Sequence, residues 1–415
     1  MTILGIFLAL KFGKQWVETY LAALNKRYYE NRAHQQEACS TLQIAEPEFQ
    51  KTLAYSQDKY RFSLVSSWTQ GLGGLAFLGL GGLGFLERAA QSLCEQMGLA
   101  GSLFTGLVFF GLLGGLSVLT SLPFSYIYTF RIEEKHGFNR QSVKGFFLDQ
   151  VKGLLVGTLL GGLLLAGLLA VMDKMGDTWW LWAWGVMSGF SLLAMWLYPT
   201  FLAPLFNKFS PLEKGPLQDG IFALAKKVNF KTAGIFIMDA SRRSSHGNAY
   251  FTGIFGEKRI VLFDTLVKSL TPEELVAVLA HELGHCKLHH IRNALLRSII
   301  MTGGVFFLLS LCWKLDVFYH AFGLQGISPH GALVVFSLWF GLMDFFLTPM
   351  GSWISRRNEF AADEFALQHI ESPVLLRRAL IKLRESNHGM PIAHPLFSFF
   401  YYSHPPLLER LAMIR

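Results

Sequence analysis

Residues 151–172 read VKGLLVGTLLGGLLLAGLLAVM, an apolar run with one charged residue. A helix of about 20 residues crosses the roughly 30 Å of hydrocarbon in a bilayer, so this run is long enough to span a membrane. Of all 415 residues, 52% are hydrophobic and 16% are charged, whereas soluble domains contain about 25% charged residues. The 40 glycines and 10 tryptophans suit packed membrane helices with aromatic anchors at the interfaces. This composition argues against a soluble, disordered or fibrous protein and predicts a polytopic membrane protein that is mainly α-helical.

Seven apolar runs have the length of a membrane span. They cover residues 3–24, 64–86, 101–130, 151–172, 178–202, 292–313 and 332–351. Lys11 and Lys14 interrupt the first run, but no basic segment precedes it and no A-x-A site follows it, so we do not expect a cleaved signal peptide. We expect a retained helix whose lysines reach the interface or face the bundle. The sequence therefore predicts seven transmembrane helices.

The formal net charge of +8 follows the predicted topology. Lys and Arg gather in four alternate segments, residues 25–61, 131–153, 203–291 and 352–415. The intervening loops contain one such residue each, in 87–100, 173–177 and 314–331. Because basic loops remain on the cytoplasmic side, we expect the N-terminus outside and both large C-terminal segments in the cytoplasm. The basic charge thus needs no nucleic-acid partner, and membrane lipids are the expected surroundings.

The four cysteines are Cys39, Cys94, Cys286 and Cys312. They are widely spaced and form no C-x-x-C pair, so we predict four free thiols rather than a disulfide framework or a cysteine zinc site.

The segment 233–269 has the character of a small β-sheet. Its runs GIFIM, NAYFTGIF and KRIVLFDTLV are rich in β-branched and aromatic residues, and the last two flank a predicted turn at Gly256 and Glu257. A capping box follows, with Thr271 and Glu274 as its two members and Pro272 at the first helical position. We predict a helix from there to about residue 290.

That helix contains His281, Glu282 and His285 in an H-E-x-x-H motif. Four helical residues turn about 400°, so the two histidines share a face one turn apart, as two ligands of one zinc ion must. Glu282 then projects beside the metal, where a carboxylate can act as general base on water.

A zinc site needs a third protein ligand, and Glu359 is the candidate. Glu359 and Asp363 lie four residues apart after the last apolar run, so a helix would place both on one face. Alone, this pair beside Arg356 and Arg357 would be read as a solvated salt-bridge surface. Together with H-E-x-x-H on the same side of the membrane, it indicates that Glu359 completes the site and Asp363 accepts the N–H of a ligating histidine.

Several segments together resemble the zinc-dependent CAAX prenyl proteases of type I. They are IEEKHGFN (132–139), PTFLAPLFNKFSPLE (199–213), RSSHGNAYF (243–251), RIVLFDTLV (259–267), HELGH (281–285), SRRNEFAADEFA (355–366) and YSHPPLLERL (402–411). These segments span most of the chain from the third apolar run onward, whereas the first 60 residues match only in general character.

The resemblance implies a seven-helix membrane barrel around a water-filled chamber, closed on the cytoplasmic side by a gluzincin-like zinc peptidase domain. It implies one Zn2+ per chain, with His281, His285 and Glu359 as ligands and Glu282 as general base. It also implies that the strand edge at Asn248 and Ala249 binds an extended substrate, and that His404 and Arg410 face the scissile carbonyl or the substrate terminus.

The remaining histidines have plainer interpretations. His289 lies one further turn from His285 and could reach a metal, but two histidines and a glutamate already fill a site that must keep a water position. We expect polar packing at the interface for His289 and His290, a core position for Cys286, and loop positions, with a rim role as the alternative, for His388 and His394.

These observations define four segments: membrane helices 1–5 with cytoplasmic loops (1–202), the cytoplasmic zinc-peptidase segment (203–291), membrane helices 6–7 (292–351) and a C-terminal cytoplasmic segment (352–415). The expected activity is zinc endopeptidase cleavage of C-terminally prenylated CAAX-type peptides or proteins. Two alternatives stay open: a quality-control zinc peptidase without a prenyl requirement, and a non-proteolytic membrane chaperone or transporter. The short stretch before Glu359 and the absence of a KDEL-type signal favour a bacterial inner membrane over an endoplasmic reticulum.

Overall fold

The computed structural model describes residues 2–252 and 258–414, and most of them are helical. The first half of the chain forms α1 (Ile3–Glu30), α2 (Arg32–Leu42), α3 (Glu46–Gly79), α4 (Gly82–Gln96), α5 (Ser102–Ile127), η1 (Tyr128–Glu133), α6 (Val143–Lys174), η2 (Gly176–Thr178), α7 (Trp179–Leu197), η3 (Tyr198–Leu202) and α8 (Ala203–Phe206). The second half contains α9 (Pro216–Lys227), η4 (Ala240–Arg242), α10 (Asp264–Ser269), α11 (Pro272–Lys287), α12 (His290–Cys312), α13 (Asp316–Ala321), α14 (Pro329–His369), α15 (Pro373–Ser386), α16 (Pro395–Tyr401) and α17 (Leu407–Met413).

Five helical stretches are long and apolar enough to cross a membrane, or six if one bent pair counts as a span. They are Ser102–Glu133, Val143–Lys174, Gly176–Phe206, His290–Cys312, Pro329–His369 and the bent pair α3–α4. These spans confirm a multi-pass membrane protein, but they do not confirm the predicted count of seven. The predicted first span forms α1, which does not join this set because Lys11, Lys14 and Glu18 interrupt its apolar run.

The predicted span 64–86 is divided between two helices, since the chain bends by 67° between α3 and α4. Gly81, in the break, has a φ of 77°, a left-handed conformation that glycine adopts without steric cost. Beyond the bend, a Cβ on Gly84 would lie 2.1 Å from the carbonyl oxygen of Gly323. The bend therefore brings α4 close to the segment between α13 and α14.

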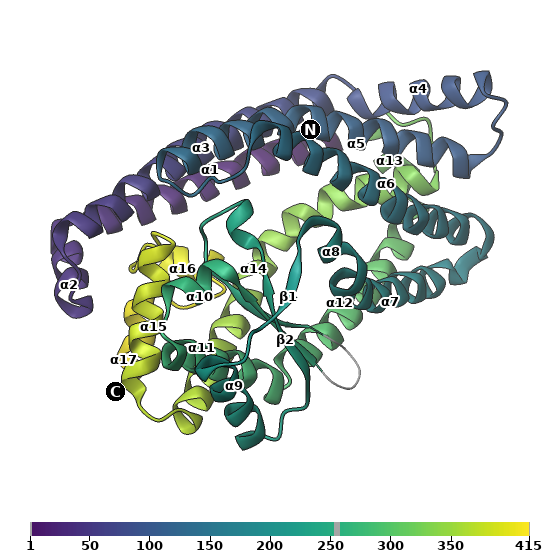
Figure 1. The fold of residues 1–415 in the computed structure, drawn as a ribbon. Coiled ribbons are helices and arrows are strands. Elements are labelled where there is room, and N and C mark those ends of the chain that lie inside the picture. The colour runs from purple at the N-terminus through teal and green to yellow at the C-terminus, as the bar shows by residue number, and fades with distance from the viewer. Residues whose placement is uncertain (1, 253–257, 415) are drawn as a thin grey trace.

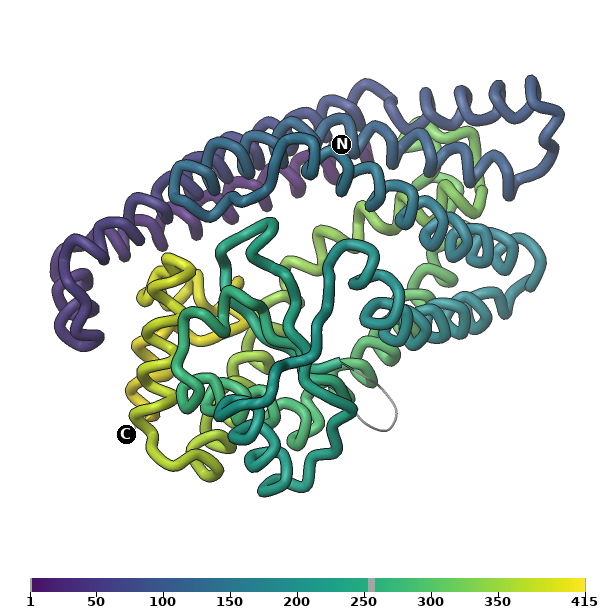
Figure 2. The backbone as a smooth tube through the Cα atoms, viewed as in Figure 1, coloured from purple at the N-terminus to yellow at the C-terminus, as the bar shows by residue number. Residues whose placement is uncertain are grey.

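The helices and the sheet occupy different parts of the molecule. In Figure 1, α1 and α3 run side by side along one edge, α4 and α13 lie at one end of it, and the sheet lies with α9 and α11 on the opposite side. Figure 2 shows the chain passing from the purple and blue N-terminal helices through the teal sheet region to the yellow C-terminal helices. Because α14 has 41 residues, it extends from the membrane part into the region of the sheet.

A mixed four-stranded sheet confirms the predicted β-rich segment. Its strands are β1 (Phe209–Pro211), β2 (Thr232–Met238), β3 (Ala249–Thr252) and β4 (Lys258–Phe263), in the order β1-β2-β4-β3. Strand β2 is parallel to β4, whereas β3 is antiparallel to β4 with Ala249 opposite Leu262. Strand β3 is thus an edge strand, and the predicted turn at Gly256 and Glu257 lies outside the described residues.

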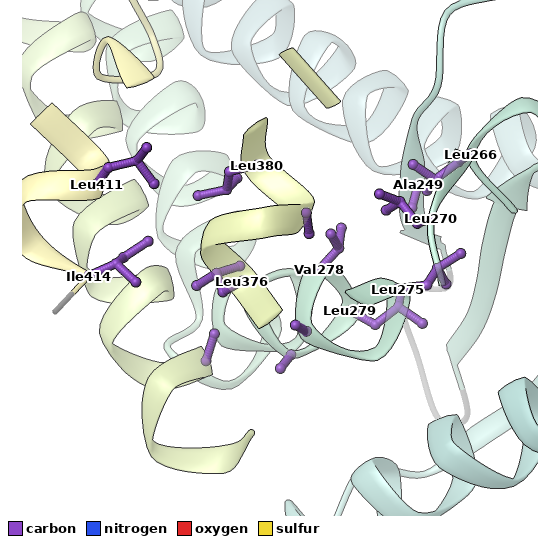
Figure 3. Packing of buried hydrophobic residues seen from close by; sticks show 14 of the residues in the cluster. Ala249, Leu266, Leu270, Leu275, Val278, Leu279, Leu376, Leu380, Leu411 and Ile414 are labelled. Carbon is purple, nitrogen blue, oxygen red and sulfur yellow. The ribbon is translucent and has the colours of Figure 1, made fainter. Parts of the chain in front are cut away.

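Helix α11 forms the centre of the core beside the sheet. As predicted, it begins after a capping box in which Thr271 Oγ1 accepts from the Glu274 N–H and the Glu274 carboxylate accepts from the Thr271 N–H. It ends at Lys287, slightly before the predicted end, because His289 has a φ of 60° and turns the chain into α12. Figure 3 shows Leu275, Val278 and Leu279 of α11 between residues of the sheet region, such as Ala249 and Leu266, and residues of α15 and α17, such as Leu376 and Leu411.

All four cysteines are free thiols, as predicted. Cys286 and Cys94 are buried, on α11 and α4 respectively.

Candidate active site

The two histidines of the H-E-x-x-H motif and Glu359 converge on one point. His281 Nε2 lies 3.2 Å from His285 Nε2 and 3.5 Å from Glu359 Oε2, and His285 Nε2 lies 3.3 Å from Glu359 Oε1. Helix α11 provides the histidines one turn apart, and α14 provides the glutamate from a position 74 residues farther along the chain than His285. This is the one such cluster of potential metal ligands in the described part of the chain.

The donor set fits a tetrahedral metal ion. Ligand atoms at about 2.0–2.1 Å from zinc lie roughly 3.3 Å from one another in tetrahedral geometry, close to the three observed separations of 3.2, 3.3 and 3.5 Å. Glu359 Oε2 is buried and makes no hydrogen bond to residues 2–252 or 258–414, although His404 Nδ1 lies 2.8 Å from it. A buried carboxylate oxygen without a hydrogen bond calls for another partner, which a cation provides.

Asp363 and Arg410 form a second layer behind this cluster. Asp363 Oδ1 lies 2.8 Å from His281 Nδ1, and Arg410 donates to both Asp363 oxygens from NH2 (2.6 Å) and Nε (2.8 Å). The guanidinium therefore binds the Asp363 carboxylate in a bidentate manner, and its NH1 is 3.7 Å from Glu359 Oε2. Both side chains are largely buried, so each charge depends on the other.

Burial and neighbouring charges shift the pKa values of the first two residues of the motif, His281 and Glu282. Burial alone would lower the pKa of His281, but the hydrogen bond to Asp363 and the neighbouring carboxylate of Glu359 reverse that direction and raise the pKa to about 9. Burial raises the pKa of Glu282 above its ordinary value, while the neighbouring His281 and His285 act in the opposite direction. A raised carboxyl pKa is the property that a general base and acid near neutral pH requires.

Two segments from other parts of the chain border the cluster. His404, in the loop between α16 and α17, has a largely exposed side chain, and its Nδ1 is the atom that approaches Glu359. Residues Tyr250, Phe251 and Thr252 of β3 line a cavity of about 780 Å³ whose wall also includes His285. The edge strand and the histidine cluster thus share one space.

Ala249 is the first residue of this edge strand, and Asn248 directly precedes it. Asn248 is exposed, and its carbonyl oxygen accepts from the Phe263 N–H at 3.0 Å, while its side-chain oxygen accepts from the Ala249 N–H at 2.8 Å. Ala249 is buried opposite Leu262. The far side of β3 is the edge that the strand order leaves without a neighbouring strand among the described residues.

The structure also brings forward residues for which the sequence indicated no role in the site. His290 Nδ1 lies 3.0 Å from His285 Nδ1, because the turn at His289 folds the start of α12 back onto α11. Gly284 lies against α14, where a Cβ would be 3.1 Å from Ala362 Cα. The sequence places His290 only five residues after His285, which brings the two residues near each other. The spacing does not give the direction of the turn at His289 that brings the two rings into contact.

A helical membrane protein with a histidine–histidine–glutamate cluster on two crossing helices, beside an edge strand, has the features of a membrane metallopeptidase. Comparison with known sequences identifies the family. Residues 27–208 match the CAAX prenyl protease N-terminal region with five membrane helices, and residues 211–415 match peptidase family M48.

Relatives from several eukaryotes align over most of their length. CAAX prenyl protease 1 of Saccharomyces cerevisiae is 36% identical, with 90% of this chain and 86% of that protein covered. The CAAX prenyl protease 1 homolog of Homo sapiens is 34% identical, with 100% of this chain and 95% of that protein covered. The crystal structure of S. mikatae Ste24p matches with a TM-score of 0.93 and 33% identity, and the match covers 100% of this chain and 99% of that one.

The chain therefore belongs to the CAAX prenyl protease family within peptidase family M48, and it is a membrane-embedded metalloprotease.

Proposed function

We propose that this protein is a zinc endopeptidase that cleaves extended peptides near their C-terminus, with prenylated CAAX proteins as the substrate class. The observation that carries the proposal is the convergence of His281, His285 and Glu359 at tetrahedral separations beside an edge strand. The names of its relatives support the substrate class, since they are CAAX prenyl proteases.

In the proposed mechanism, His281, His285 and Glu359 hold one zinc ion. Bound zinc acidifies a coordinated water and polarises a carbonyl group. Glu282 takes a proton from the attacking water and later returns it to the leaving amine, a role that its raised pKa favours. Because Glu282 both accepts a proton from the water and returns it to the amine, its carboxylate must lie close to the water and to the scissile bond.

The outer residues position the ligands and the substrate. Asp363 accepts the N–H of His281 and so fixes the ring with Nε2 toward the metal. Arg410 holds Asp363 from behind, and its NH1 or the exposed His404 is the proposed donor to the oxyanion. The main chain of Asn248 and Ala249 is proposed to bind the peptide by strand addition, because edge strands offer unpaired N–H and C=O groups.

The orientation in the membrane remains a proposal. The basic segments 203–291 and 352–415, which carry the site, belong on the cytoplasmic side by the positive-inside rule. Membrane lipids then surround the apolar helices, and the compartment is the bacterial inner membrane or, in a eukaryote, the endoplasmic reticulum. The division into segments 1–202, 203–291, 292–351 and 352–415 likewise remains a proposal.

The test uses detergent-purified protein, a farnesylated CAAX peptide and its unmodified twin. We expect cleavage of the farnesylated peptide by the wild type, loss of cleavage after chelation, and at least about a hundredfold loss of kcat in Glu282→Gln with zinc retained, since a general base contributes about 10²–10⁴-fold. A zinc-loaded Glu282→Gln variant with normal turnover would reject the base assignment. Equal cleavage of both peptides would favour the quality-control peptidase, and zinc binding without any cleavage would favour the non-proteolytic alternative.

A further inference from the structure

Two of the sequence segments that carry the family resemblance, 132–139 and 243–251, meet in space, although the mechanism above uses only Asn248 and Ala249 of them. Asn139 forms an isolated β-bridge with Ser244, and the Ser245 N–H donates to the carbonyl oxygen of Phe138 at 3.2 Å. The first segment begins in η1, at the end of the membrane stretch Ser102–Glu133, whereas the second leads into the edge strand β3. Their contact therefore joins the membrane part to the start of that strand.

His246 is held on both sides at this junction. Its Nε2 lies 3.2 Å from Glu133 Oε2, and its Nδ1 lies 3.1 Å from Asn387 Oδ1. The Gly247 N–H also donates to Asn387 Oδ1 at 3.2 Å, so that atom is an acceptor. Both ring nitrogens of His246 thus face oxygen atoms of other residues, which hold the ring from two sides.

Further contacts restrict the orientation of this pair. The ring of Phe138 stacks on that of His246 at 4.2 Å with an interplanar angle of 17°. Tyr55 of α3 donates to Glu133 Oε1 at 2.6 Å, and only 13% of the Glu133 side chain is exposed. One carboxylate oxygen of Glu133 is therefore held by α3, while the other contacts His246.

On the strand side, the fixed groups are close to the proposed substrate edge. Thr265 Oγ1 donates to the His246 carbonyl oxygen at 2.9 Å, and Asn387 binds the Gly247 amide. Asn248 and Ala249 follow immediately. Displacement of His246 would consequently move the first residues of the edge to which a peptide would add.

We propose that Glu133 and His246 are positioning residues, which hold the start of strand β3 in place so that an extended peptide can pair with its edge. This inference rests on the proposed function, because it assigns the pair to substrate binding. Neither residue is a proposed ligand, base or oxyanion donor. The pair should therefore affect KM and leave the proton-transfer steps intact.

The chain contains a matched control for this pair. Asp58 of α3 accepts from His136 Nε2 at 2.8 Å and from Lys135 Nζ at 2.6 Å. His136 belongs to the same 132–139 segment, but its ion pair with Asp58 does not include the 243–251 segment. Removing Asp58 thus breaks a similar pair in the same region without releasing the strand.

The experiment compares Glu133→Ala, Glu133→Gln, His246→Ala and Asp58→Ala in the full-length protein. Loss of a charged hydrogen bond of this kind should raise KM for the farnesylated peptide about tenfold, with kcat and zinc content near those of the wild type. Amide hydrogen exchange should become faster at residues 245–252 in both alanine variants of the pair, less so in Glu133→Gln, and remain unchanged there in Asp58→Ala.

The outcomes separate this inference from the proposed function. Unchanged KM, or an equal change in Asp58→Ala, would overturn the positioning role, and so would unchanged exchange at residues 245–252. If the wild-type protein cleaves no peptide, the proposed function has failed. Hydrogen exchange alone then decides whether Glu133 and His246 fix the strand.

Discussion

At the scale of single residues, Asp363 connects the two charged layers of the site. Its carboxylate is shared between the imidazole of His281 and the guanidinium of Arg410. Replacement by asparagine keeps one oxygen for His281 but removes the charge that Arg410 pairs with. Outer-layer partners of this kind typically contribute about 10–100-fold to metal affinity, so we expect Asp363→Asn to weaken zinc binding by that factor in chelator competition.

The neighbouring Glu364 is a suitable control for this prediction, since it is exposed on the same turn of α14. Glu364→Gln should bind zinc as the wild type does. Equal zinc affinity in Asp363→Asn and in the wild type would show that Asp363 does not support His281 as proposed.

His290 provides a second residue-scale prediction. If His285 binds zinc through Nε2, its Nδ1–H can donate to His290 Nδ1, which lies 3.0 Å away. His290→Ala should therefore weaken zinc binding by about tenfold, the lower end of the range for such partners, as measured by chelator titration. His289→Asn is the control because His289 is exposed and has a positive φ that asparagine tolerates. A similar loss in both variants would assign the effect to the turn rather than to the His290 ring.

The sequence could predict which residues form the metal cluster because helical spacing and ligand chemistry restrict the choice. The i, i+4 spacing places His281 beside His285, and it places Glu359 beside Asp363 on the other helix. The contact between His290 and His285 was not predicted, for a physical reason. Its approach to His285 depends on the left-handed backbone at His289, which the sequence does not specify since histidine adopts that conformation only rarely.

At the scale of elements, the site depends on how closely α11 approaches α14. Gly284 lies at this crossing, where an added Cβ would be 3.1 Å from Ala362 Cα and 3.2 Å from its carbonyl oxygen. Gly284→Ala should force the helices apart, at a cost of about 1–3 kcal/mol in unfolding free energy, and move Glu359 away from the two histidines. We expect a lower Tm together with weaker zinc binding.

Gly304 of α12 is the matched control, because a Cβ there would meet no atom within 4 Å. Gly304→Ala should keep zinc affinity and leave Tm unchanged or slightly higher, since alanine favours the helix by about 1 kcal/mol. If Gly284→Ala binds zinc normally, the close approach of these two helices is not what aligns Glu359.

The sequence predicted the ends of helices that depend on neighbouring residues, but it did not predict shapes that depend on contacts between distant residues. The capping box at Thr271 and Glu274 predicted the start of α11 because both partners lie within one turn. The bend between α3 and α4 was missed because apolar composition continues through it, while its shape depends on the contact between Gly84 and Gly323, far apart in sequence.

At the scale of the whole molecule, hydrophobicity predicted membrane spans but not their pairing. Helix α14 begins near α4 and α13, and its last part carries Glu359 and Asp363 beside α11. A single sequence contains no signal for such an arrangement, because apolar helices of similar composition can pack in many orders. Because Lys11 and Lys14 interrupt the apolar run of α1, hydrophobicity alone did not decide whether α1 crosses the membrane.

One buried pair connects distant parts of this arrangement. Glu87 of α4 accepts from the Gln325 N–H at 2.8 Å, and its other oxygen lies 3.1 Å from His330 Nε2 at the start of α14. Glu87 is 2% exposed and His330 is 3% exposed. Because removal of Glu87 leaves the Gln325 N–H and the buried His330 ring without their acceptor, Glu87→Ala should cost about 1–3 kcal/mol in unfolding free energy.

Helix α4 lies far from α11 in Figure 1, so loss of the Glu87–His330 pair should lower Tm without altering zinc affinity. Glu87→Gln should be milder, since its amide oxygen can still accept from the Gln325 N–H and its NH2 group can donate to His330 Nε2 once the ring carries its proton on Nδ1. Glu95→Ala, at an exposed position of the same helix, should unfold at the wild-type temperature. If thermal unfolding in detergent shows the same Tm for Glu87→Ala and Glu95→Ala, this pair does not hold α4 to α14. Reduced zinc affinity in Glu87→Ala would instead show that the membrane helices and the metal cluster are energetically coupled over the length of α14.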